Sequence, residues 1–228
     1  MNHTLARFAL ILAALAQTAQ ATEPQPRVVA FVGKLISINE LPDQCPDTDK
    51  PKESPKTLQS ICIQMNSLYE AQYEVIEILN GDFRSKEITF KIADHNGFPD
   101  FADYQHALLF VDVGPTQNWL EKYQGYAVHP TSTNSWASCG NPYYGSDKET
   151  PPKLRPISFA NDFGSVGEFS KEGIARRFYD SKEIVVDGDR ITCRNGIYAS
   201  DLYETVRTGV LSARGILLPA LDLRRNDL

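Results

Sequence analysis

Five stretches between residues 28 and 130 carry the alternating hydrophobic pattern of β-strands. Each is rich in β-branched or aromatic residues, and turn-forming residues precede each one after the first. The second and third are separated only by Asn80-Gly81-Asp82 and a short polar run, which predicts a β-hairpin. The predicted strands are Val28–Asn39, Tyr69–Leu79, Lys86–Ala93, Ala107–Val113 and Tyr123–His129.

The second stretch is apolar on both of its faces. Its alternation runs from Tyr69 to Val75 and then breaks, because Ile76 and Ile78 place apolar side chains on the opposite face. The first stretch carries Gly33 in mid-run, which is typical of a bend or a bulge. A coiled strand that packs on two sides as a sheet closes needs such features. The pattern therefore favours a small closed barrel, and the alternative is an open sheet covered on both faces.

The second half of the chain has a different pattern. Residues 131–168 are dense in Ser, Asn, Gly and Pro and predict an irregular loop, which in a compact domain is often functional. Beyond it, hydrophobic spacing predicts a short helix over Ser170–Tyr179, a hairpin over Lys182–Tyr198 and a helix over Asp201–Leu211. The fold class is thus mainly β: a five-stranded closed barrel followed by a loop, a hairpin and two short helices.

The first 21 residues have the pattern of a secretory signal peptide. Arg7 supplies the positive charge, Phe8–Ala16 is a short apolar run, and Ala19–Ala21 is a small-x-small cleavage site. The alternative is an uncleaved N-terminal helix. We expect a periplasmic or secreted protein divided into a signal peptide (1–21), a barrel (22–130) and an α/β extension packed on the barrel (131–228).

Charge and hydropathy narrow the choice of partners. The formal net charge is −6, and no block of Lys or Arg is present, so nucleic acids and anionic membranes are poor partners. No later segment is long and apolar enough to span a bilayer. A basic protein surface remains compatible with this composition.

Four cysteines, an even number, all follow the predicted cleavage site. In an oxidising compartment they predict two disulfides, for which three connectivities exist. Pairing Cys45 with Cys62 closes a short polar loop and leaves Cys139 with Cys193. A zinc site is the alternative, but it needs close pairs such as C-x-x-C, and the sequence has none.

The hydrophobic layout of residues 28–130 resembles the OB-type barrel of netrin and TIMP-like modules. The stretches that carry the resemblance are AFVGKLISI, YEVIEILNGDF, ITFKIADHNG and ALLFVDV. The resemblance implies a barrel whose loops bind a partner. TIMPs inhibit metalloproteases through an N-terminal cysteine that chelates zinc. The first cysteine here is Cys45, so that inhibitory mechanism is not implied.

Catalytic motifs are missing from the sequence. It contains no G-x-S-x-G elbow, no phosphate-binding loop and no H-E-x-x-H spacing. A metal site could be drawn from acids and imidazoles in one region, against the alternative that these are solvated loop residues; they are Asp94, His95, Asp103 and His106. No cofactor or metal is expected.

Aromatic residues in the long polar loop are the best binding candidates. Trp136, Tyr143 and Tyr144 lie beside Cys139, and loop Trp and Tyr provide large, rigid contact areas. The alternative is that these rings pack back onto the barrel. Trp119 and Tyr123 are weaker candidates.

These observations favour an exported, disulfide-bonded binding protein over an enzyme. Its partner would be a protein or an envelope component, and its role that of an inhibitor or accessory factor. Two alternatives stay open: a structural subunit of an envelope complex, and an envelope hydrolase that uses Asp94, Asp100 and Asp103.

Overall fold

The computed structural model describes residues 27–42, 65–143, 153–161, 163–165 and 181–221. Several predictions fall outside the described residues: the signal peptide, the Cys45–Cys62 pair, Tyr144 and the helix at Ser170–Tyr179. Within the described ranges, none of the helices has the length and apolar character that a membrane crossing requires.

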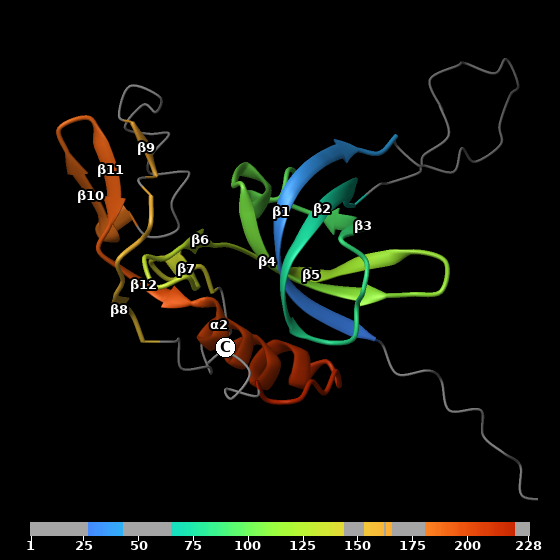
Figure 1. Cartoon of the computed structure of the whole chain (residues 1–228). Helices are drawn as coiled ribbons and strands as arrows, with labels where there is room; N and C mark the ends of the chain where they lie inside the picture. The colour runs from blue at the N-terminus through green and yellow to red at the C-terminus, as the bar shows by residue number, and fades with distance from the viewer. Residues whose placement is uncertain (1–26, 43–64, 144–152, 162, 166–180, 222–228) are drawn as a thin grey trace, which may run out of the picture.

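Five strands in the first half of the chain close into a barrel (Figure 1). They are β1 (Val28–Glu40), β2 (Ser67–Asn80), β3 (Glu87–Asp94), β4 (His106–Val113) and β5 (Asn118–Ala127). Their order around the barrel is β1-β2-β3-β5-β4, with β1 closing on β4. Strands β3 and β5 are parallel neighbours, and the other pairs are antiparallel. The predicted OB-like barrel and the hairpin of its second and third strands are confirmed.

Strand β1 is buried on both faces, which explains its continuous apolar sequence. Val29 and Phe31 belong to the core inside the barrel, whereas Ala30 and Val32 belong to a second core outside it. Successive side chains of a strand point to opposite faces, so one strand serves both cores. The pairing register with β2 shifts at Val32/Gly33, and this confirms the irregularity predicted at Gly33.

The phase break in β2 marks the passage from one core to the other. Tyr73 packs inside the barrel, and Leu79 packs against the outer core. Register shifts against β1 accompany this change, as expected for a coiled strand. Ile76 and Ile78 are exposed, however, so the apolar residues on the second face do not add to either core.

The extension is built from short strands and a helix. One sheet has the order β6-β7-β12-β8 and the other β10-β11-β9. The strands are β6 (His129–Pro130), β7 (Trp136–Cys139), β8 (Arg155–Pro156), β9 (Gly164–Ser165), β10 (Ile184–Asp187), β11 (Arg190–Cys193) and β12 (Asn195–Tyr198). The helical elements are the 3-10 helices η1 (Asp100–Asp103) and η3 (Ser181–Glu183), the α-helix α2 (Ala199–Val206) and the π-helical segment η4 (Arg207–Leu211).

The prediction of an irregular segment over residues 131–168 was partly wrong. Residues 136–139 and 155–156 pair with β12, and residues 164–165 pair with β11. These short strands exist because distant partners supply their hydrogen bonds, and local periodicity cannot reveal such pairing. The predicted hairpin turn is confirmed, since Asp187 pairs with Arg190.

The disulfide Cys139–Cys193 confirms one predicted pair. It joins β7 of one small sheet to β11 of the other, with a Cα–Cα distance of 5.8 Å. The bond therefore holds the two sheets of the extension together.

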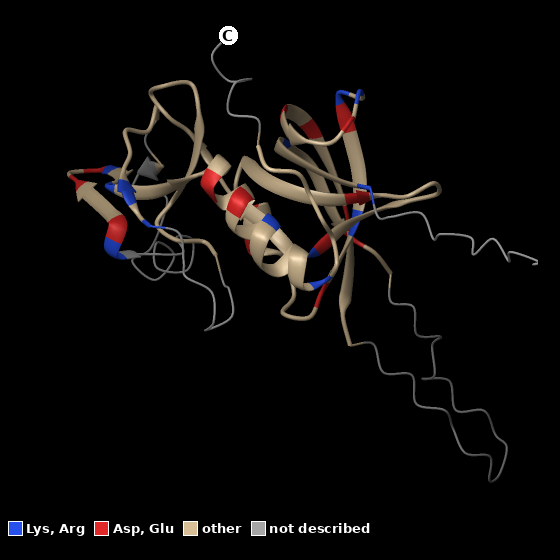
Figure 2. Ribbon diagram, turned by 90° about the horizontal axis from the view of Figure 1, so that it is seen from below, with Lys and Arg blue, Asp and Glu red and all other residues tan. Residues whose placement is uncertain are grey.

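Helix α2 covers the outer face of the barrel (Figure 1). The ring of Tyr203 stacks on Phe110 of β4, with 5.9 Å between the ring centroids. Leu202, Val206 and Leu211 are buried in the same outer core. Figure 2 shows Lys and Arg at scattered positions over the barrel, the helix and the far hairpin, as the sequence predicted.

One buried hydroxyl inside the barrel has no hydrogen-bond partner among the described residues. It belongs to Tyr73, whose ring stacks on Phe90 with a centroid distance of 5.6 Å. Burial raises the pKa of Tyr73, so the hydroxyl stays protonated. An unsatisfied buried polar group destabilises the native state.

Tyr73→Phe should therefore raise the free energy of unfolding by about 1–2 kcal/mol, measured by urea unfolding. Tyr203→Phe is the matched control, because the Tyr203 hydroxyl donates to the Pro219 carbonyl at 2.7 Å. That control should lose about 1 kcal/mol. A Tyr73→Phe variant that is less stable than the wild type would contradict this prediction.

Candidate functional site

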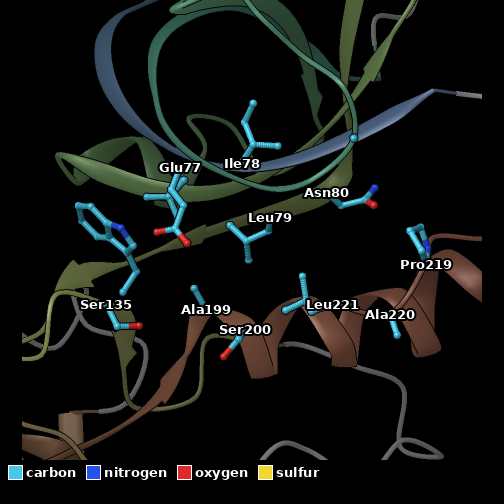
Figure 3. A pocket seen from close by; sticks show the side chains of 13 residues that line it. Glu77, Ile78, Leu79, Asn80, Ser135, Ala199, Ser200, Pro219, Ala220 and Leu221 are labelled. Carbon is cyan, nitrogen blue, oxygen red and sulfur yellow. The ribbon is translucent and has the colours of Figure 1, made fainter. Parts of the chain in front are cut away.

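A groove with a volume of about 380 Å³ lies between the end of β2 and the helical extension. We call it the barrel–extension groove. In Figure 3, Leu79 points toward the helix and Leu221, whereas Ile78 points the other way. The lining residues come from distant parts of the sequence; they are Val32, Glu77–Gly81, Ser135, Trp136, Ala199, Ser200 and Pro219–Leu221. The groove exists only because the extension folds against the barrel.

Trp136 forms part of this groove and is held from two sides. It is the first residue of β7, pairs with Pro130 of β6 and packs against the outer core. Its ring lies 4.9 Å from the ring of His106, centroid to centroid. The disulfide at Cys139, at the other end of the same strand, fixes β7 further. The half-buried indole is therefore a rigid wall rather than part of a loose loop.

Tyr143, a second predicted binding aromatic, is not among the residues that line the groove. Tyr143 is only 7% exposed and lies in the outer core, with its ring 6.4 Å from that of Tyr126. This placement matches the alternative that the loop rings pack onto the barrel. Tyr144 is outside the described residues, so Trp136 is the predicted binding residue that the structure brings to a groove.

His106, beneath Trp136, is neutral at neutral pH. Partial burial lowers the pKa of His106, and the nearby Lys34 lowers it further, while Glu74 opposes them. A neutral imidazole can pack against the indole without the cost of desolvating a charge.

The pH dependence of stability follows from this lowered pKa. Below the ordinary value of 6.5, the unfolded chain takes up a proton at His106 that the native state resists. The contribution of His106 to the free energy of unfolding is therefore present above pH 6.5 and is lost as the pH falls below it.

In His106→Gln, the fall in melting temperature between about pH 7 and pH 5 should be smaller than in the wild type. Identical profiles for wild type and His106→Gln would contradict this assignment.

A second cleft, of about 480 Å³, lies on another part of the barrel–extension boundary. We call it the acidic–aromatic cleft. Its walls are the loop around Asp94–Phe101, the middle of β5, Pro142, Val210 and Arg214. Asp94 and Asp100, two of the three acids considered for a hydrolase, both line it.

The carboxyl group of Asp100 is affected by its surroundings in this cleft. Partial burial raises the pKa of Asp100, and the neighbouring Asp103 and Asp94 raise it further. The structure thus brings the three aspartates near each other, although Asp103 is not among the residues that line the cleft.

Sequence reasoning undervalued two aromatic residues of this cleft. Phe98 is 47% exposed and Tyr123 is 45% exposed, and both line the cleft. The only sequence signal for Phe98 was an aromatic residue in a polar loop. Tyr123 stood at the predicted start of the fifth strand, but that strand begins earlier, at Asn118.

The candidate metal ligands of the sequence have separate surroundings. His95 contacts the backbone carbonyl of Met65, whereas His106 packs against the ring of Trp136. Across the described ranges, no group of three or more His, Cys, Asp or Glu side chains is placed to share a metal ion.

Comparison with known proteins finds no matching family model, no matching curated protein and no matching solved structure. The resemblance of the barrel to netrin and TIMP-like modules therefore stays a prediction.

Proposed function

We propose that this protein is an exported, disulfide-bonded binding protein that recognises a protein or an envelope component through the barrel–extension groove. The observation that carries the proposal is the rigid indole of Trp136 in the wall of a preformed groove. Anchored tryptophans are frequent binding hot spots, and a preformed site lowers the entropy cost of association.

Two further features support this proposal. The disulfide Cys139–Cys193 is typical of proteins in an oxidising compartment, which agrees with the predicted signal peptide. The netrin and TIMP-like resemblance of residues 28–130 favours a binding module as well, although a fold alone does not define an activity.

Affinity capture from envelope extracts of the native host, followed by identification and purification of the partner, tests the proposal. We expect Trp136→Ala to weaken the measured Kd at least about tenfold, as for an interface hot spot. Trp119→Ala is the matched control, because Trp119 does not line the groove. A purified partner that binds wild type and Trp136→Ala with equal affinity would rule out this groove as the contact site.

The acidic–aromatic cleft favours one alternative, an envelope hydrolase. A carboxyl group with a raised pKa, such as Asp100, can act as a general acid. Release of products from labelled peptidoglycan or chromogenic glycosides by the wild type, and its loss in Asp100→Asn, would favour this activity. No turnover by the wild type would favour the binding protein.

A further inference from the structure

Strand β5 carries a wide bulge opposite β4. Leu109 pairs with Gly125 and Val111 pairs with Leu120, so Phe110 alone stands opposite residues 121–124. Within the bulge, Tyr123 has a φ of 63°. This left-handed conformation is unfavourable for a tyrosine and persists only where the surroundings enforce it.

Hydrogen bonds from the extension and from β5 itself hold the bulge in place. The Lys122 carbonyl accepts one from Arg214 at 3.1 Å and another from the Gln124 amide at 3.0 Å. Arg214 also pairs with Glu121 at 3.3 Å, and the Tyr126 hydroxyl donates to Gln124 at 2.6 Å. These bonds leave the Tyr123 side chain presented toward solvent at the cleft.

The opposite wall of the cleft is equally well anchored. Phe98 meets Tyr69 edge to face, with 5.7 Å between the ring centroids. Phe101, in the same loop, lies so close to Gly125 that a Cβ there would approach its ring to 2.6 Å. The loop and the bulge are therefore packed directly on one another, and the two exposed rings share one preformed cleft.

The charges in the cleft favour a cation. Among the described residues, no Lys or Arg forms an ion pair with Asp94 or Asp100. Arg214 lines the cleft, but its guanidinium is engaged by Glu121 and the Lys122 carbonyl. The Lys122 ammonium lies 5.1 Å from the centroid of the Tyr123 ring, so this ring already takes part in one cation–π contact within the chain.

We propose that the acidic–aromatic cleft is a second docking site, which takes a Lys or Arg side chain from an extended segment of a partner protein. The carboxylates of Asp94 and Asp100 pair with the cation, and the rings of Phe98 and Tyr123 contact its alkyl stem and its charge. A bound cation also offsets the mutual repulsion of the carboxylates, which an uncharged ligand cannot do. This site is separate from the barrel–extension groove and does not depend on the function proposed for it.

Four synthetic pentapeptides test the proposal: acetyl-Gly-Ser-X-Ser-Gly-amide, with arginine, lysine, citrulline or norleucine at X. Binding to the full mature chain is followed by NMR through the backbone amides of residues 94–98, 100–101 and 120–125. We expect the arginine and lysine peptides to bind at least about tenfold more tightly than the citrulline and norleucine peptides, and more weakly as salt is added.

Three variants separate recognition from folding. Asp100→Asn keeps the shape of the side chain and should weaken arginine-peptide binding at least about tenfold. Tyr123→Gly should weaken binding without lowering the melting temperature, because glycine adopts a positive φ without strain. Trp136→Ala should leave peptide binding unchanged, which distinguishes this site from the groove. Equal binding of arginine and citrulline peptides, amide shifts outside the cleft, or no binding at about 10 mM peptide would overturn the proposal.

Discussion

Replacing Cys139 and Cys193 together by alanine should lower the free energy of unfolding by about 4 kcal/mol. The two residues are 54 positions apart, so the bond removes much conformational entropy from the unfolded chain. The double variant is preferable to a reducing agent, since a reductant would also act on the other predicted pair. Guanidinium unfolding followed by circular dichroism measures the loss.

Loss of this disulfide should also affect the groove. Trp136 begins the strand that ends at Cys139, and without the bond only hydrogen bonds and packing hold that strand. We therefore expect weaker partner binding in the double variant than its folded fraction alone explains. A variant that unfolds at the wild-type guanidinium concentration would show that the bond adds nothing to stability. The Cys45→Ala/Cys62→Ala double variant is the comparison and should lose less, because the predicted bond closes a shorter loop.

Tyr203→Ala should lower the free energy of unfolding by about 3–5 kcal/mol. The side chain is fully buried between α2 and the barrel, stacks on Phe110 and donates its hydroxyl to Pro219. Removing the ring leaves a cavity between α2 and β4. Because the hydrogen bonds of the closed barrel hold β4 in place, β4 cannot shift to fill this cavity. Urea unfolding monitored by tryptophan fluorescence and by circular dichroism measures the change.

The same variant tests whether the barrel and the extension are one cooperative unit. Since β1 contributes to both cores, we expect a single transition that shifts as a whole. Two separate transitions, with only the extension destabilised, would show that the barrel folds independently. Tyr203→Phe, expected to lose about 1 kcal/mol, separates the hydroxyl from the ring.

Both candidate sites depend on this shared boundary. The groove needs Ala199 and Leu221 beside β2, and the cleft needs Val210 and Arg214 beside β5. Packing of the helix on the barrel therefore positions the groove and the cleft at once. We expect Tyr203→Ala to weaken binding at both sites, whereas Trp136→Ala and Asp100→Asn each affect one.

The sequence by itself determined the five barrel strands, the hairpin of the second and third, and the irregularity of β1 at Gly33. Alternation along a strand reports directly which faces lose contact with water, so local pattern was sufficient there. The phase break between Tyr73 and Leu79 indicated closure of the sheet, because a strand that coils around a barrel packs on two sides. Counting cysteines and comparing loop lengths was enough to propose the Cys139–Cys193 bond.

Only the tertiary structure decided where the polar second half folds and what it exposes. The strand at Trp136–Cys139 forms because β12, nearly 60 residues later, pairs with it, and Tyr143 is buried because the barrel offers it an apolar surface. The acidic–aromatic cleft likewise needs a left-handed Tyr123, whose neighbour Lys122 is held by Arg214, 92 positions away. Hydrogen bonds and contacts between residues so far apart leave no periodic trace in the chain, because each depends on the position of its partner in space.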